Sequence, residues 1–226
     1  MSFDLIIFDC DSTLSTIEGI DYLAQNSSNY AEIKSLTDLA MSSGTFNLDV
    51  YEQRLSLINM NQHMLEELAE MYWKNLTPGS LELIQALQSL GKRCCILSAG
   101  MNPAISIFGA MLGINAEDIY AVELDFDDNG NYRGIVDNIE LTSLGGKPLL
   151  VEQIKQKYQA KAVLIGDGAN DLEAKSSADL VVGFGGNVYR EQIADKFDVY
   201  VSNSNILGVL PFILNQEEQE ILQINN

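Results

Sequence analysis

Several residue types that mark common classes of protein are scarce in this sequence. Its 226 residues include 13 basic ones against 32 acidic ones, and the formal net charge is −19. A surface for nucleic acid or for an anionic membrane needs a basic footprint, so we expect neither partner. The three cysteines show no metal-ligand spacing, because Cys10 stands alone and Cys94 and Cys95 are neighbours on an apolar run. We expect small buried thiols and a reducing compartment.

The amino-terminal region also lacks the marks of a leader peptide or a membrane span. It has no basic segment, and Asp9 interrupts its first apolar run. No internal repeat or low-complexity segment is visible. We therefore expect a soluble, cytoplasmic protein, monomeric or homodimeric, with enough residues to bury a substantial core.

The most informative stretch comes almost at the start of the chain. Residues 5–8 are apolar and mostly β-branched or aromatic, which predicts a short strand buried on both faces. Asp9 and Asp11 follow it directly. A buried carboxylate needs a cation, and residues two apart in an extended chain point to the same side, so the pair could share one hard ion or one substrate. The alternative is a capping turn at residues 11–13 with no further role.

Residues 16–77 form a region without strand signals. Apolar residues recur there at helical spacing, for example in residues 64–72. This pattern predicts a helical insert that begins directly after the acidic turn and could cover the strand ends as a lid. We expect a small cap domain at 16–77 and a core domain made of 1–15 and 78–226.

After Thr77 the pattern changes to alternating strands and helices. We expect helices to begin at Thr77-Pro78, at Asn102-Pro103 and at Gly145-Gly146, a hairpin turn at 128–131, and a solvated acidic tail from Gln216. The expected strands lie at residues 94–97, 119–122, 162–165, 180–182 and 199–201. This alternation predicts an α/β fold with a doubly wound parallel sheet.

Polar residues stand at the carboxyl ends of the predicted core strands. In a doubly wound sheet these ends form the ligand crevice, so residues far apart in the chain should meet there. Lys147, at a helix start, adds a cation. The predicted cluster is Asp9, Asp11, Ser98, Lys147, Asp167, Asn170 and Asp171.

With these residues assembled, the chain resembles the haloacid dehalogenase-like hydrolases and, within them, the phosphoserine phosphatases. The resemblance extends from Phe8 to about Val209. The family motif Asp-x-Asp-x-Thr is matched by Asp9, Asp11 and Thr13, and its Gly-Asp-Gly-x-x-Asp motif by residues 166–171. The family serine and lysine are matched by Ser98 and Lys147. The closer match rests on residues 18–21, 40–41, 54–55 and 183–190.

The resemblance implies a Mg²⁺-dependent phosphatase that acts on O-phospho-L-serine through an aspartyl-phosphate on Asp9. Mg²⁺ would be held by the carboxylates of Asp9 and Asp167 and by the carbonyl of Asp11. Asp11 would serve as general acid and base, and Ser98 and Lys147 would bind the phosphoryl group. Asp171 would orient Lys147 or a metal-bound water.

The same resemblance suggests how the rest of the substrate is bound. The family glutamate and arginine matched by Glu18 and Arg54 read its amino and carboxylate ends, although Arg54 could instead be an exposed helix partner of Glu52 or Glu66. Met41, Ala99 and Asn170 are further candidates. Arg190 could contact the crevice or an acidic neighbour.

The chain departs from the family pattern at two places. Asn47 stands where the family usually has phenylalanine, which keeps open a phosphatase for another small phosphomonoester. Ala99 replaces the first glycine of the usual Ser-Gly-Gly, but its backbone N–H can still face a phosphate. A phospho-acceptor signalling module is a further alternative, because it also uses an aspartate, Mg²⁺ and a lysine in a doubly wound sheet. His63 lies among polar residues and is expected on the surface.

Overall fold

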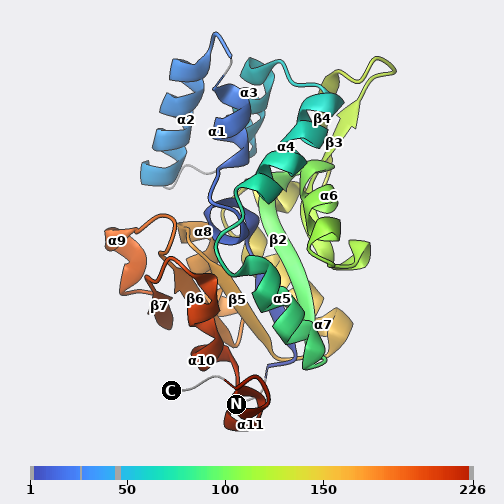
Figure 1. Cartoon of the computed structure of the whole chain (residues 1–226). Helices are drawn as coiled ribbons and strands as arrows, with labels where there is room; N and C mark the ends of the chain where they lie inside the picture. Colours follow the sequence, from blue (N-terminus) through green and yellow to red (C-terminus); the bar gives the residue numbers. More distant parts are fainter. Residues whose placement is uncertain (1–2, 26, 44–46, 224–226) are drawn as a thin grey trace.

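The computed structural model describes residues 3–25, 27–43 and 47–223, with side chains left out from 37 to 43. In this described part the strands form one seven-stranded sheet in the order β4-β3-β2-β1-β5-β6-β7, parallel except for β4 (Figure 1). The strands are β1 (Leu5–Phe8), β2 (Arg93–Met101), β3 (Ile119–Phe126), β4 (Tyr132–Asp137), β5 (Ala162–Gly166), β6 (Leu180–Phe184) and β7 (Val199–Val201). The predicted doubly wound α/β fold is confirmed.

Strand β1 is central because its side chains are apolar on both faces. All four residues are fully buried between β2 and β5. The backbone N–H of Asp9 donates to the carbonyl of Ile165 at 2.9 Å, so the strand pairing extends one residue further. Asp9 is therefore fixed at the carboxyl end of the central strand, followed by the turn η1 (Cys10–Leu14).

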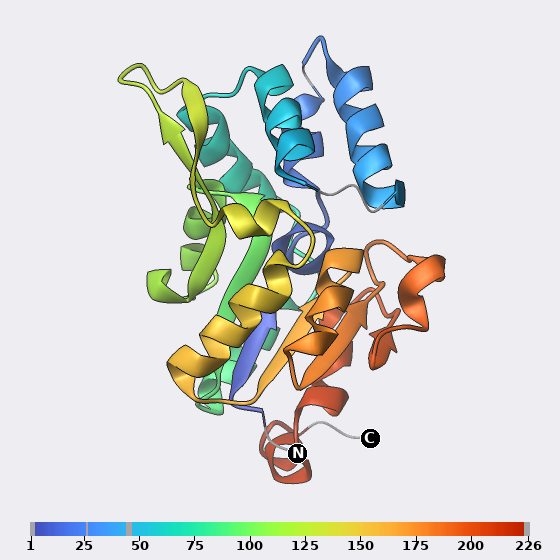
Figure 2. The ribbon, with the colours of Figure 1, turned by 180° about the vertical axis from the view of Figure 1, so that it is seen from behind.

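Helices cover both faces of the sheet. Helix α5 lies in front of the sheet in Figure 1, whereas α7 lies in front of it in the opposite view of Figure 2, so the two pack on opposite faces. The longer helices and helical turns of this part are α5 (Ser80–Ser89), α6 (Ala104–Met111), η2 (Ala116–Asp118), η3 (Ile139–Thr142), α7 (Gly146–Tyr158), α8 (Ala169–Glu173) and η4 (Ala174–Ser176). Towards the carboxyl terminus follow α9 (Glu191–Ala194), η5 (Ile206–Val209), α10 (Leu210–Ile213) and α11 (Gln216–Ile221).

Four helices separate β1 from β2 in the sequence: α1 (Gly19–Ala24), α2 (Tyr30–Ser43), α3 (Leu48–Ile58) and α4 (Gln62–Lys74). In Figure 1, α1, α2 and α3 stand beyond the carboxyl ends of the core strands. Asparagine side chains begin two of the helices. Asn47 accepts from the N–H of Val50, and Asn61 accepts from the N–H of Met64, each at 3.0 Å. Asn47 is thus a helix cap at a place where a phenylalanine could not make this bond.

One predicted helix start was wrong, and another was confirmed to within a residue. Helix α5 begins at Ser80, after Gly79 in the left-handed region (φ 88°), and not at Thr77-Pro78. Helix α6 begins at Ala104 with Pro103 as its N-cap, next to the start predicted at Asn102-Pro103. The acidic tail is not merely solvated, because α11 carries Glu218, which pairs with the buried Lys92 at 2.6 Å. Among the described residues, no helix has the length and apolar character needed to cross a bilayer.

Candidate active site

A cavity lies between the carboxyl ends of the core strands and the helices of the insert. Its floor is formed by strand-end residues, including Asp9, Ser98 and Asp167, and its far wall by residues of α1 and α3. The structure thus brings together residues from both ends of the sequence. The lining also includes Asp11, Glu18, Tyr51, Arg54, Ala99, Gly100, Asn170 and Arg190.

Asp9 and Lys147 form a buried ion pair at the base of this cavity. The Lys147 ammonium lies 2.9 Å from Asp9 Oδ2 and 2.6 Å from Asp171 Oδ1. Asp171 Oδ2 also accepts from the N–H of Gly168 at 2.9 Å, so both of its oxygens are engaged. Burial raises the pKa of Asp9 well above its ordinary value, and the Asp171 charge adds to this, while Lys147 opposes it.

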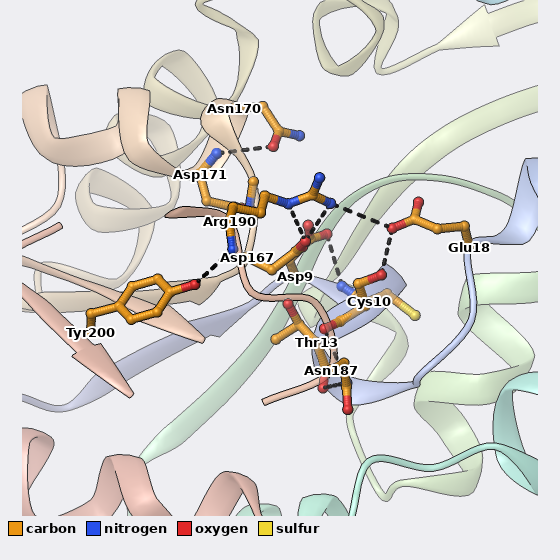
Figure 3. A network of polar contacts seen from close by, with 12 residues as sticks. Asp9, Cys10, Thr13, Glu18, Asp167, Asn170, Asp171, Asn187, Arg190 and Tyr200 are labelled. Atoms are coloured by element: carbon orange, nitrogen blue, oxygen red, sulfur yellow. Dashed lines mark hydrogen bonds and ion pairs between the residues drawn. The ribbon is translucent and has the colours of Figure 1, made fainter. Parts of the chain in front are cut away.

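The turn η1 presents Asp11 beside Asp9. Asp11 and Ser12 have non-helical backbone angles, with Ser12 in the left-handed region at φ 53°. Asn187, which follows β6, lies beside this turn near Thr13 (Figure 3). It donates to the carbonyl of Ser12 at 3.0 Å and to the hydroxyl of Thr77 at 2.6 Å, which fixes the turn.

The carboxylate of Asp11 receives three donors. Gly19 N–H and the Tyr72 hydroxyl reach Oδ1 at 2.5 and 2.8 Å, and the Ser98 hydroxyl reaches Oδ2 at 3.4 Å. Burial raises the pKa of Asp11, and these donors oppose the increase. Burial and the Asp11 charge also raise the pKa of Tyr72 well above its ordinary value, so the phenol keeps its proton.

Asp167 is paired with Arg190. Both Nε and one terminal nitrogen of Arg190 donate to the same oxygen, Asp167 Oδ2, at 2.8 and 2.6 Å. Figure 3 shows the guanidinium between Asp167 and Glu18. Burial raises the pKa of Asp167 to about 6, against the influence of Arg190. Both of the alternatives considered for Arg190 are met, since it lines the cavity and binds an acidic neighbour.

Glu18 stands at the entrance of α1 and faces the same cavity. Its Oε1 accepts from the Ser12 hydroxyl at 2.5 Å and lies 3.9 Å from Arg190. Burial raises the pKa of Glu18 to about 8, and the charges of Asp11 and Asp167 add to the effect. The carboxylate form of Glu18 is thus disfavoured at this place, and a cationic ligand group beside it would lower its pKa.

The end of β2 contributes backbone as well as side chain. Ser98 is fully buried, and its hydroxyl accepts from the N–H of Gly100 at 3.0 Å. The carbonyl of Ala99 accepts from the hydroxyl of Tyr51, a buried residue of α3, at 2.7 Å. This bond ties the helical insert to the strand end beside the cavity.

Arg54 is the buried cation of the far wall. It is 7% exposed, so it is no surface partner of Glu52 or Glu66. Within the part of the chain that the structure describes, its Nε has no hydrogen-bond partner. A buried guanidinium N–H that faces a cavity requires an acceptor, and an anionic ligand group would supply one. Asn170 also lines the cavity, and its Oδ1 accepts from the N–H of Asp171 at 3.0 Å.

The donor atoms fit a hard divalent cation. One oxygen each from Asp9, Asp167 and Asp171 lie within 4.8 Å of one another, and all three residues are buried. Carboxylate oxygens are the ligands that such ions prefer. Both oxygens of Asp9 and both of Asp171 already accept from donors of the protein, whereas both Arg190 donors to Asp167 end on Oδ2. Among the described contacts, Asp167 Oδ1 is therefore the most available ligand atom of the three residues.

The sequence analysis did not identify two tyrosines of the site, and one of its predicted substrate contacts has a side chain that the structure does not describe. Tyr51 and Tyr72 lie at helical spacing among apolar residues and have the sequence signal of core residues, yet both hydroxyls point at the site. The side chain of Met41 lies outside the described part of the structure. His63 is on the surface as predicted, with its side chain 74% exposed beside Glu67.

Comparison with known proteins gives one consistent picture. The model of the haloacid dehalogenase-like hydrolases matches residues 6–175. Mouse phosphoserine phosphatase is 35% identical over 92% of this chain and 94% of its own length. A phosphoserine phosphohydrolase-like protein from Francisella tularensis superposes with a TM-score of 0.81, at 25% identity over 95% of this chain and all of that one. A phospho-aspartyl intermediate analogue of phosphoserine phosphatase superposes with a TM-score of 0.79, at the same identity and coverage.

Proposed function

Because the chain belongs to the phosphoserine phosphatase family of the haloacid dehalogenase-like hydrolases, we propose that it hydrolyses O-phospho-L-serine to L-serine and phosphate. The observation that carries this substrate is Arg54. Its buried guanidinium has an N–H without a partner among the described residues and shares a cavity with Asp9 and Ser98. One cavity thus offers a phosphate end and a separate anion-binding end, as a small phosphorylated amino acid requires.

Asp9 is the proposed nucleophile. Its oxygen attacks phosphorus, the bond from phosphorus to the serine oxygen breaks, and an aspartyl-phosphate forms. Lys147, 2.9 Å from Asp9, offsets the charge that gathers on the nucleophile and the phosphoryl group, and Asp171 orients Lys147. Ser98 and the backbone of Ala99, which line the same cavity, are assigned to the binding of phosphoryl oxygens. A relative has been solved as an analogue of such a phospho-aspartyl intermediate.

Asp11 is the proposed general acid and base. In its protonated form it gives the proton to the departing serine oxygen. The resulting carboxylate then takes a proton from the water that attacks the aspartyl-phosphate, and the bond from phosphorus to Asp9 breaks. Phosphate leaves, and both aspartates return to their starting forms.

Mg²⁺ is the proposed metal, bound by the carboxylates of Asp9 and Asp167 and by the backbone carbonyl of Asp11. When bound, it would reduce the repulsion between an anionic nucleophile and an anionic substrate. The Asp167 pair with Arg190 is compatible with this role, because both donors of Arg190 end on Oδ2 and the pair itself leaves Oδ1 available.

The two ends of the amino acid would be read by the wall of the cavity. Glu18 is assigned to the substrate ammonium and Arg54 to its carboxylate. Asn170 and Arg190 line the same cavity and are assigned to substrate contacts, as is Met41. Residues 16–77 are assigned to a cap domain, and residues 1–15 and 78–226 to the core. The three free, buried cysteines agree with a cytoplasmic setting, and we propose a monomer or homodimer.

The test compares kcat/KM for phosphoserine, phosphothreonine, phosphohomoserine and p-nitrophenyl phosphate, with Mg²⁺ or with EDTA. We expect phosphoserine to be preferred over the aryl ester and activity to be lost in EDTA. Arg54→Ala should raise KM for phosphoserine about 10- to 100-fold, because a charge-assisted contact is lost, and change p-nitrophenyl phosphate little.

A matched control is Arg93→Lys, since Arg93 lies at the far end of β2 and pairs with Asp118. It should leave the ratio of the two substrates unchanged. Equal kcat/KM values for phosphoserine and the aryl ester in the wild type would contradict phosphoserine as the specific substrate. The protein would then be a phosphatase for another small phosphomonoester. A stable phospho-protein after incubation with acetyl phosphate would favour a signalling module instead.

A further inference from the structure

We propose that Tyr72 is a positioning residue that fixes Asp11 for proton transfer to poor leaving groups. The inference rests on the proposed function, in which Asp11 protonates the leaving oxygen, and adds a residue from helix α4 to it. The Tyr72 side chain is fully buried and donates to Asp11 Oδ1 at 2.8 Å.

Two donors on one oxygen decide which oxygen carries the proton. Gly19 N–H also reaches Oδ1, at 2.5 Å, so this oxygen faces two hydrogens. A proton placed there would meet both donors, whereas among the described residues Oδ2 has only the longer contact with the Ser98 hydroxyl at 3.4 Å. The protonated form of Asp11 therefore holds its proton on Oδ2, the oxygen that Ser98 contacts, and Asp11 and Ser98 both line the cavity. Tyr72 and Gly19 together set this orientation.

The residue type at position 19 allows the Gly19 N–H and the Tyr72 hydroxyl to reach the same oxygen, Asp11 Oδ1. A Cβ atom on residue 19 would overlap the Tyr72 hydroxyl and would lie 3.3 Å from Asp11 Oδ1. Only glycine at this place lets the backbone and the phenol converge. The Tyr72 ring is in turn packed against Phe108 of α6, with centroids 5.4 Å apart, which limits its movement away from Asp11. The hydrogen bonds of Gly19 and Tyr72 to Asp11 therefore both depend on the absence of a side chain at residue 19.

A leaving-group comparison separates positioning from a general structural role. Phosphoserine releases an alkoxide that requires a proton, whereas p-nitrophenyl phosphate releases a stable phenolate that does not. Tyr72→Phe keeps the ring and removes the donor. We expect kcat/KM for phosphoserine to fall about 10- to 100-fold and that for p-nitrophenyl phosphate to change less than about threefold.

Tyr158→Phe is the matched control. Tyr158 also donates to a buried aspartate, Asp118, at 2.7 Å, but at the other end of the sheet. We expect this variant to keep wild-type kcat/KM for both esters. Equal losses for both esters in Tyr72→Phe, or no loss for phosphoserine, would overturn the inference.

A double-mutant cycle tests the geometry itself. Gly19→Ala should give the same selective loss as Tyr72→Phe. It should cost less when Tyr72 is already phenylalanine, because the overlap with the hydroxyl is gone and only tight contacts of 3.1 Å with the ring carbon Cζ and 3.3 Å with Asp11 Oδ1 remain. Fully additive losses would contradict the shared contact. If the wild type does not hydrolyse phosphoserine, the proposed substrate fails independently, and the same comparison is made with whichever alkyl ester of the panel it does hydrolyse.

Discussion

At the amino ends of the strands, acidic and basic side chains form ion pairs, whereas at the carboxyl ends acidic side chains outnumber basic ones. We call the first group the amino edge; its ion pairs are Lys92–Glu218, Arg93–Asp118, Lys155–Asp179 and Lys175–Asp198, each with a contact between 2.6 and 2.9 Å. We call the second the carboxyl edge; its described residues are the acids Asp9, Asp11, Glu18, Asp167 and Asp171 and the cations Arg54, Lys147 and Arg190.

The charges of the amino edge form ion pairs that stabilise the fold, whereas those of the carboxyl edge are suited to binding a ligand. At the amino edge, Asp179 and Asp198 also accept from backbone N–H groups of the neighbouring strands, each at 2.9 Å, which fixes strand to strand. At the carboxyl edge, burial without enough cations raises the pKa of four acids, and Arg54 Nε has no described partner. Such a cluster is costly for stability and points to function.

The largest contrast should come from neutralising one buried aspartate at each edge. Asp9→Asn should lower kcat for phosphoserine about 10⁴-fold or more, because the nucleophile is lost, while the melting temperature stays the same or rises. Asp118→Asn should keep kcat and lower the free energy of unfolding by about 1–3 kcal/mol, since Asp118 is 2% exposed and binds both Arg93 and Tyr158. Steady-state kinetics and urea denaturation measure the two effects. Retained turnover in Asp9→Asn would remove it as the nucleophile.

Mg²⁺ should raise the melting temperature only when the acids of the carboxyl edge are intact. A ligand at about 100 times its Kd adds about 2.7 kcal/mol, which for a chain of this size raises the melting temperature by roughly 5–10 °C. We expect Mg²⁺ to produce this shift in the wild type and in Asp179→Asn, but not in Asp167→Asn. An equal shift in all three proteins would place the ion elsewhere.

The sequence allowed the fold and the carboxyl edge to be predicted because both depend on local patterns. The apolar run before Asp9 and the polar residues after each strand specify which side chains meet, given that parallel strands end at one rim. Cap signals were less reliable. Thr77-Pro78 resembles a helix start, but the hydroxyl of Thr77 accepts from Asn187 and the helix begins beyond Gly79.

The amino edge and the two tyrosines could not be predicted in the same way. Lys92 and Glu218 are 126 residues apart, and nothing local to either shows that α11 returns to the start of β2. Tyr51 and Tyr72 have the spacing of core residues, because their rings are core residues. Only the tertiary placement of α3 and α4 directs their hydroxyls to Ala99 and Asp11.

The smallest expected effects concern the pH dependence of the free energy of unfolding in metal-free protein. The contributions of Glu18 and Asp179 should change with pH in opposite directions. Glu18 has a folded-state pKa of about 8, above its ordinary value of 4.5, so between these values the folded state binds more protons than the unfolded state. Its contribution therefore falls as pH rises. Asp11, Asp167, Arg54 and Arg190 act on it from the surrounding elements. The free energy of unfolding of Glu18→Gln should thus rise relative to wild type from pH 5 to pH 8.

Asp179 should behave in the opposite way. Burial pushes its pKa up, but the Ala162 N–H and Lys155 outweigh this and hold the pKa below its ordinary value of 3.8. Its contribution is present above that value and is lost as pH falls through the folded-state pKa. The deficit of Asp179→Asn, less than about 1 kcal/mol at pH 7 because the pair is partly exposed, should shrink toward pH 3. Urea denaturation in EDTA measures both variants, and slopes of the same sign would show that the two edges do not differ in how they carry charge.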